Sequence, residues 1–291
     1  MNLKEFFNNH LPAIETNLVQ LVEKIQAPSE LKESMLYSLK AGGKRVRPMY
    51  VVAVAEMYGI SYEDAYTVGA AVEMIHTYSL IHDDLPCMDD DSMRRGKPTN
   101  HVVYGEALAT LAGDALNTLA FGVLARMNIS AEKRIELVNM LSVAAGAEGM
   151  VGGQVLDIDG EQRHLGLEEL ENVHKNKTGA LLRFSIEAGA VLADASVADR
   201  AALVNYGHHI GLAFQIQDDI LDIIGTSEEL GKTAGKDVAS EKSTYPSLLT
   251  LDGAREKLEY HYNLALDALQ NVSVDTALLA HFAEFIVKRN K

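Results

Sequence analysis

Five aspartates fall within nine residues, 83–91, directly after an apolar run and with no lysine or arginine among them. Carboxylates this close raise one another's pKa, so such a cluster is costly unless a cation binds to it. A second cluster, IQDDILD at 216–222, echoes the first, IHDDLPCMD at 81–89. A solvated acidic loop would explain either cluster alone, but two matched clusters after apolar helices predict a cation site.

The spacing within each cluster predicts how its carboxylates are presented. Asp218 and Asp222 lie at i and i+4, so on a helix they share a face. Asp83 and Asp89 do not share a regular helical face, and Pro86 cannot extend a helix without cost. We therefore expect the chain to leave its helix after the first pair and to bring Asp89 back.

Oxygen ligands of this kind favour Mg²⁺, which bridges carboxylates to substrate phosphates. The absence of a histidine pair at metal-ligand spacing argues against zinc. Basic residues stand in turns near both clusters, where arginine suits phosphate oxygens by its fork and lysine as a point charge. Taken singly, each is more readily explained as a solvated surface charge, but together they predict two polyphosphate pockets, one that binds through metal and one that binds directly. These residues are GGKRVRP at 42–48, Arg94-Arg95-Gly96, Lys177-Thr178-Gly179, and Lys232, Lys236 and Lys242.

Composition limits the function classes. The 291 residues carry a formal net charge of −15, which disfavours sequence-independent binding to nucleic acid. The single cysteine, Cys87, excludes an intramolecular disulfide and fits a reducing cytoplasm. The N-terminus lacks the pattern of a signal peptide, and no apolar stretch of ~18 residues predicts a membrane span.

The elements that must position these residues are predicted to be helices. No proline lies between Pro98 and Pro246, and alternating β-branched runs are nearly absent. Residues 64–84 and 106–127 are apolar almost all round, which indicates buried helices. No linker divides the chain, so we expect one all-α domain over residues 1–291, a large helical bundle around a deep apolar cavity. The other expected helices are 11–26, 132–151, 168–193, 198–224 and 252–270, with breaks at Gly42-Gly43, Gly59, 96–98, Gly160, Gly166 and 225–235.

Taken together, these motifs resemble the short-chain trans-prenyl diphosphate synthases, and most of all the bacterial farnesyl type. The resemblance covers nearly the whole chain in order, and the final FIVKRNK is similar to the basic tail of that family. Each element alone is modest, but the set is highly specific. The matching elements are GGKRVRP at 42–48, DDxxxxD at 83–89, RRG at 94–96, GGQxLD at 152–157, KT at 177–178, FQxxDDxLD at 214–222, GKD at 235–237 and KSTYP at 242–246.

The resemblance implies an all-α homodimer that joins isopentenyl diphosphate to an allylic diphosphate held by three Mg²⁺ ions, or by Mn²⁺ in their place. It implies Asp83, Asp89 and Asp218 as the main metal ligands, supported by Asp84, Asp219 and Asp222. Arg94, Lys177 and Lys232 would contact the allylic diphosphate, and Lys44, Arg47, His76 and Arg95 would hold isopentenyl diphosphate. Phe214 and Gln215 would flank the reacting atoms, with the Lys177 carbonyl, the Thr178 hydroxyl and the Gln215 amide facing the allylic cation.

Product length is expected to depend on Tyr78, five residues before Asp83 and about 7.5 Å deeper along a helix. A bulky ring there would form the floor of the cavity, and in the family an aromatic residue at this position goes with a C15 product. The small Ser79 beside it leaves a geranyl or geranylgeranyl diphosphate synthase as alternatives.

Two further alternatives stay open. A terpene cyclase of the same fold would need no second basic pocket, so GGKRVRP and His76 count against it. A non-catalytic partner subunit would be expected to lose acidic ligands, whereas both clusters are intact.

Overall fold

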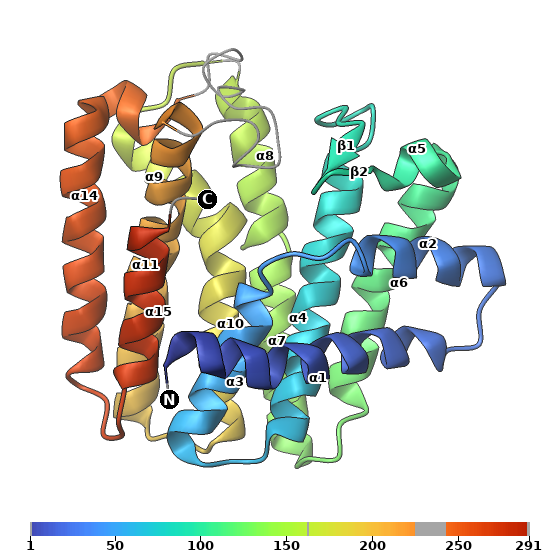
Figure 1. The fold of residues 1–291 in the computed structure, drawn as a ribbon, viewed down its shortest axis with the longest axis horizontal. Coiled ribbons are helices and arrows are strands. Elements are labelled where there is room, and N and C mark those ends of the chain that lie inside the picture. The colour runs from blue at the N-terminus through green and yellow to red at the C-terminus, as the bar shows by residue number, and fades with distance from the viewer. Residues whose placement is uncertain (1, 162, 225–242, 290–291) are drawn as a thin grey trace.

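The computed structural model describes residues 2–161, 163–224 and 243–289, and these are almost entirely helical (Figure 1). The helices before the first aspartate cluster are α1 (Leu3–Glu23), α2 (Ser29–Leu39), α3 (Val46–Tyr58) and α4 (Tyr62–Asp83). After it come β1 (Met93–Arg94), β2 (Lys97–Pro98), α5 (Asn100–Tyr104), α6 (Glu106–Ala125), α7 (Ala131–Ala145) and α8 (Met150–Glu161). The chain continues with α9 (Leu167–His174), a π-helical turn η1 (Lys175–Gly179), α10 (Ala180–Leu192), α11 (Val197–Ile224), α14 (Tyr245–Leu269) and α15 (Ala277–Lys288).

Side chains at the helix starts explain several of these boundaries. The Asn2 side chain accepts from the Glu5 amide, and Glu5 reaches back to the Asn2 amide, which forms a capping box at α1. Ser61 caps α4, and Ser130 caps α7, through their hydroxyl groups. Each cap satisfies an amide that the helix itself leaves without a partner.

The inner helices α3, α4 and α10 lie in the middle of the molecule, and α11, α14 and α15 stand together on one side (Figure 1). Residues 48–55 of α3 are all buried, and α10 is buried along most of its length. Helices that are apolar all round belong in such a position, because every face meets another helix. The all-α bundle predicted from the sequence is confirmed.

Some predicted boundaries are wrong. Residues 132–151 do not form one helix, since α7 ends at Ala145 and α8 begins at Met150. A Cβ at Gly149 would lie 2.2 Å from the carbonyl oxygen of Ala144, so this turn is closed to ordinary residues. The stretch predicted as a helix over 168–193 is interrupted by η1, and helices α2, α3 and α15 were not predicted.

One described helix, α6, is long and apolar enough to cross a membrane by length and composition. Such a helix is weak evidence for a span, because core helices of globular proteins pass the same test. Here α6 packs against α4 and α2, and Ala109, Ala112 and Leu116 are fully buried in that contact region.

A pair of histidines joins α11 to α14. The Nδ1 atoms of His209 and His261 lie 3.1 Å apart. Burial, with a smaller effect of His208, lowers the pKa of His209 to about 4. Burial, together with His209, Lys257 and His208, lowers the pKa of His261 to about 3. Both rings are therefore neutral in the folded protein at pH 7.

Because these histidines would titrate near 6.5 when unfolded, the unfolded chain binds more protons below that pH. We expect the free energy of unfolding to fall as pH drops from 6.5 toward 4. In urea unfolding at pH 7 and pH 5, the variant His209→Gln should lose less stability between the two conditions than the wild type. An equal loss in both proteins would show that this pair does not carry the dependence.

Candidate active site

The first aspartate cluster lies where α4 ends. Asp83 is the last residue of the helix, Asp84 caps it, and the following loop turns back. The Asp89 amide donates a hydrogen bond of 2.8 Å to the Asp83 carbonyl. The return of Asp89 toward the helix end, predicted from Pro86, is therefore seen in the structure.

The carboxylates of this cluster are unequal. Burial raises the pKa of Asp83 to about 6, with Asp89 and Asp84 adding to the rise and Lys177 and Arg94 opposing it. Burial also raises the pKa of Asp84, but Arg94 opposes this by binding both its oxygens, at 2.8 and 2.9 Å from Nε. Asp83 thus has the greater need of an added cation.

The second cluster lies near the end of α11, and its first carboxylate faces a cation from the C-terminus. Asp218 Oδ1 is 2.6 Å from Nη2 of Arg289, whose guanidinium also lies 4.0 Å from the Phe214 ring centroid. The amide of Gln217 donates to the Arg289 carbonyl at 2.9 Å and anchors the tail. The sequence placed Arg289 only in a basic tail, and this long-range contact gave no local signal.

The side chain of Asp219 is buried and contacts α14 and α9. Its Oδ2 accepts from the Tyr245 amide at 3.0 Å, at the start of α14, and lies 3.8 Å from Nε2 of His174. The His174 ring stacks on Tyr245, with centroids 5.7 Å apart. Asp222 is also buried. Asp218 is thus the most accessible carboxylate of this cluster, and His174 and Tyr245 are neighbours that the sequence analysis missed.

In the described part of the chain, no three His, Cys, Asp or Glu side chains are placed to hold a metal ion by themselves. Mg²⁺ commonly binds through one or two carboxylates and completes its shell with water and substrate phosphate. The partly buried Asp83 and the accessible Asp218 supply oxygen donors of that kind. The donors present therefore fit Mg²⁺ bound together with a phosphate ligand.

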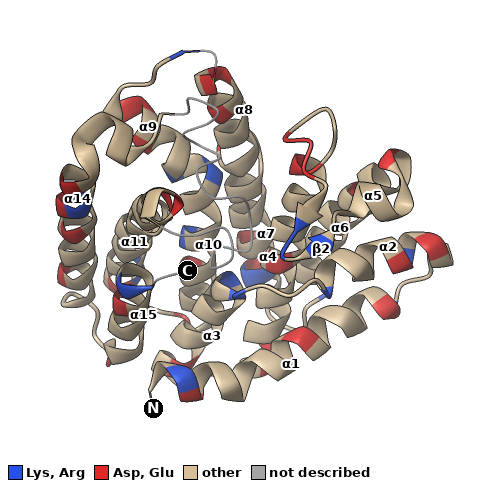
Figure 2. Ribbon diagram, turned by 45° about the horizontal axis from the view of Figure 1, so that its top comes forward, with Lys and Arg blue, Asp and Glu red and all other residues tan. Residues whose placement is uncertain are grey.

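A cavity of about 360 Å³ gathers basic residues that are far apart in sequence. Lys44 comes from the turn before α3, Arg47 from α3, His76 from α4 and Arg95 from the β1–β2 turn, while Phe214 of α11 closes one side. Figure 2 shows Lys and Arg near α3 and β2, with further residues of both charges on the surrounding helices. This acidic protein thus brings several positive charges together at one cavity.

Basic residues outnumber acidic ones in this cavity, and Glu73, which also lines it, is paired with Arg45 at 2.7 Å. Burial, followed by the effects of Arg47, Arg95, Arg94 and Arg45, lowers the pKa of His76 well below its ordinary value. Arg47 is half-buried, and its Nε is a buried atom with no hydrogen-bond partner among the described residues. A guanidinium with an unused, buried donor is suited to an anionic ligand.

Strained backbone shapes this cavity. Arg45 and Arg95 both have left-handed conformations, with φ of 48° and 52°. Gly43, with φ of 133°, lies so close to Arg95 that a Cβ would come within 2.7 Å of the guanidinium carbon. Arg45, not predicted as a site residue, also lines the cavity, and its buried side chain pairs with Glu73 at 2.7 Å. Strain of this kind is characteristic of functional sites.

The π-helical turn η1 presents Lys177 and Thr178. Lys177 Nζ pairs with Asp157 of α8 at 2.6 Å, and the Thr178 hydroxyl donates to Gln215 Oε1 of α11 at 3.0 Å. A Cβ at Gly153 would lie 2.1 Å from the Lys177 amide nitrogen, so the GGQ motif lets α8 lie directly against η1. All four polar residues line a second cavity of about 190 Å³ that Asp219 also borders.

The two residues predicted to set product length, Tyr78 and Ser79, lie on α4, four to five residues before Asp83 at the end of the helix. Tyr78 is buried, and its ring meets the edge of His82 at a centroid distance of 5.7 Å. The Ser79 hydroxyl donates to the His76 carbonyl at 2.9 Å. The remaining predicted contact, Lys232, lies outside the described residues, as do Lys236 and Lys242.

Known proteins resemble this chain over most of its length. A family profile described as polyprenyl synthetase matches residues 28–278. The farnesyl diphosphate synthase of Bacillus subtilis (strain 168) is 53% identical over 99% of this chain and 98% of its own. The chloroplastic geranylgeranyl pyrophosphate synthase of Catharanthus roseus is 46% identical over 91% of this chain and 76% of its own.

Among solved structures, a FPP/GFPP synthase from Zymomonas mobilis in its apo form superposes with a TM-score of 0.87, at 37% identity and 98% coverage of both chains. The profile match spans most of the chain, and the sequence relatives and the solved structure agree with it. The chain therefore belongs to the polyprenyl synthetase family.

Proposed function

We propose that this protein is a farnesyl diphosphate synthase, which condenses isopentenyl diphosphate with dimethylallyl diphosphate and then with geranyl diphosphate. The observation that carries this proposal is the basic cavity beside the first aspartate cluster, in which Lys44, Arg47, His76 and Arg95 converge. A second diphosphate held without metal distinguishes chain elongation from cyclisation of a single allylic diphosphate. The relatives named above support the C15 assignment.

The allylic diphosphate would be bound between the two aspartate clusters. Asp83, Asp89 and Asp218 would bind the metal, proposed as three Mg²⁺ ions or Mn²⁺. Asp84, Asp219 and Asp222 would support these three ligands. The pairing of Asp84 with Arg94 and the contact of Asp219 with the Tyr245 amide support this secondary role. When bound, the metal ions would offset negative charge on the departing diphosphate.

The chain's own residues would assist each step of the reaction. Arg94 and Lys177, with Lys232, stabilise the diphosphate as the allylic C–O bond breaks and the leaving group takes the electron pair. The Lys177 carbonyl, the Thr178 hydroxyl and the Gln215 amide turn their dipoles toward the cation at C1, and Phe214 helps to exclude water.

Isopentenyl diphosphate, held by Lys44, Arg47, His76 and Arg95, attacks that carbon with its double bond. A new C–C bond forms, and a proton leaves C2 of the isopentenyl unit for the released diphosphate. The contact of Thr178 with Gln215 supports their joint placement at the reacting carbon.

The deciding experiment measures product length. Purified protein is incubated with Mg²⁺, labelled isopentenyl diphosphate and dimethylallyl diphosphate, and the dephosphorylated products are separated by size. A dominant C15 alcohol supports the proposal, whereas C10 or C20 keeps the chemistry and corrects the product. Consumption of the allylic substrate without incorporation of label would favour a cyclase. No consumption of either substrate would favour a non-catalytic subunit.

Replacing Tyr78 with alanine is expected to shift the product from C15 toward C20, because removal of the ring deepens the cavity below the reacting carbon. The matched variant Tyr78→Phe keeps the ring and should keep the C15 product. Unchanged C15 output from Tyr78→Ala, measured by the same separation, would rule out Tyr78 as the floor.

The proposed assembly is a homodimer of single-domain chains in the cytoplasm. One buried cluster that draws on helices from α1 to α15 supports a single domain over residues 1–291. Exposed apolar side chains on α5, α6 and α7 support an interface there: Val102, Val103, Leu111, Ile135 and Val143. The exposed Cys87 supports a reducing compartment.

A further inference from the structure

A buried polar network ties α2 to the first residue of α5. The Asn100 amide donates to the Ser34 carbonyl at 2.9 Å and to the Ser38 hydroxyl at 2.8 Å, while the Ser34 hydroxyl donates to Asn100 Oδ1 at 2.8 Å. Only 2% of Asn100 is exposed. Both donors and the acceptor of this amide are therefore used within the protein.

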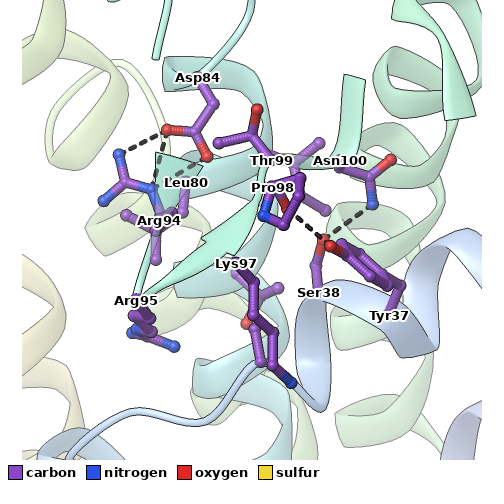
Figure 3. A pocket seen from close by; sticks show the side chains of 13 residues that line it. Tyr37, Ser38, Leu80, Asp84, Arg94, Arg95, Lys97, Pro98, Thr99 and Asn100 are labelled. Atoms are coloured by element: carbon purple, nitrogen blue, oxygen red, sulfur yellow. Dashed lines mark hydrogen bonds and ion pairs between the residues drawn. The ribbon is translucent and has the colours of Figure 1, made fainter. Parts of the chain in front are cut away.

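Asn100 follows the hairpin of β1 and β2 in the chain and lies beside it in the structure (Figure 3). The Thr99 amide donates to the Ser92 carbonyl at 3.0 Å, and the Thr99 hydroxyl to the Asp91 carbonyl at 2.7 Å, which closes the base of the hairpin. The Tyr37 hydroxyl of α2 donates to the Pro98 carbonyl at 2.7 Å. Strands of two residues are too short to hold their own position, so α2 holds this hairpin in place.

The hairpin carries two arginines that face different parts of the site. Arg94 binds both oxygens of Asp84 at the first aspartate cluster (Figure 3). Arg95 donates to the Gly42 carbonyl and lines the basic cavity. A displacement of the hairpin would therefore move both arginines at once.

We propose that Asn100 is a positioning residue, which acts with Tyr37 of α2 to hold Arg95 in the basic cavity and Arg94 on Asp84. This inference rests on the proposed function, because it assigns the basic cavity to isopentenyl diphosphate. A purely structural network would affect only folding, whereas a positioning network also affects the Michaelis constant for that substrate.

The test compares kinetics with stability in single variants. Asn100→Ala is expected to raise the KM for isopentenyl diphosphate about tenfold. A misplacement of ~1 Å can lower the rate of a reaction about a hundredfold, so an effect of this size is reasonable. Tyr37→Phe, which removes one hydrogen bond, should raise that KM by a smaller factor of about two to three. Both variants are assayed at saturating allylic substrate and unfolded in urea.

Tyr206→Phe is the matched control for the second variant. It removes a tyrosine hydrogen bond to a backbone carbonyl, that of Leu279 at 2.8 Å, together with a longer contact of 3.5 Å to the Tyr50 hydroxyl, and both lie away from the hairpin. It should lower the urea midpoint and leave the KM unchanged.

An unchanged KM in Asn100→Ala, with a lowered urea midpoint, would overturn the inference. If that variant does not fold, Tyr37→Phe carries the test, and a KM equal to that of Tyr206→Phe would overturn it. A wild-type protein that incorporates no isopentenyl unit would overturn the proposed function itself.

Discussion

Replacing Asp218 with asparagine is expected to lower kcat by about 10²–10³-fold at saturating substrate, the usual loss when one stabilising group is removed from a transition state. Asp218 is the accessible carboxylate of the second cluster, and its neighbour Asp219 is occupied by the Tyr245 amide. Asparagine keeps the size of the side chain and an acceptor for Arg289 but loses the negative charge that a divalent cation requires. We therefore expect loss of metal binding with the fold retained.

The measurement is kcat across a Mg²⁺ titration, together with direct binding of Mn²⁺ followed by electron paramagnetic resonance. Asp252→Asn is the matched control, because Asp252 is exposed on α14 and, among the described residues, its ion pair is with Arg255, three residues further on. The control should behave as the wild type in both measurements. Wild-type Mn²⁺ binding and kcat in Asp218→Asn would contradict the proposed role of the second cluster.

The local placement of the aspartates could be predicted because it depends on residue type and short spacing. The i, i+4 aspartates of the second cluster and the Pro86 turn of the first follow from helix geometry alone. The all-α architecture follows equally from the long proline-free, apolar stretches. The convergence of Lys44, Arg47, His76 and Arg95 in one cavity was predicted only through the family resemblance, and the structure places them together.

Contacts between residues distant in sequence could not be predicted. The residues around Arg289 in the sequence do not indicate that it pairs with Asp218. The residues around Tyr245 do not indicate that its amide binds Asp219. The π-helical turn at 175–179 was missed for a related reason, since it depends on how closely α8 approaches through Gly153. Such features depend on packing between helices, which cannot be predicted from the periodicity of the sequence.

Replacing Glu73 with alanine is expected to lower the free energy of unfolding by about 3–5 kcal/mol, the typical cost of removing the close partner of a buried charge. The ion pair that Arg45 keeps, with Glu15, is longer at 3.7 Å and lies on the exposed side. Glu73 of α4 lies 2.7 Å from Arg45, and the side chains are only 3% and 2% exposed. Arg45 also donates to the Leu39 carbonyl at 2.5 Å, so it cannot turn outward without breaking a second contact. Urea unfolding measures the loss.

Glu284→Ala is the control for this measurement, because Glu284 forms an exposed pair with Lys288 on α15 and its removal should hardly move the urea midpoint. The double variant Arg45→Met, Glu73→Leu should regain much of the stability, since a well-packed apolar pair can replace a buried ion pair. A loss below ~1 kcal/mol in Glu73→Ala would mean that Arg45 finds another partner or water.

Loss of the ion pair between Arg45 and Glu73 should also affect substrate binding at the proposed active site. Arg45 stands with a left-handed backbone between Lys44 and Arg47, and its ion pair with Glu73 anchors the turn that presents those two residues to the basic cavity. We expect the stabilised double variant to show a raised KM for isopentenyl diphosphate even where its unfolding resembles that of the wild type. A wild-type KM in that variant would show that helix α3 alone places Lys44 and Arg47. A raised KM would show that the buried ion pair of Arg45 with Glu73 is needed to position the residues that bind isopentenyl diphosphate.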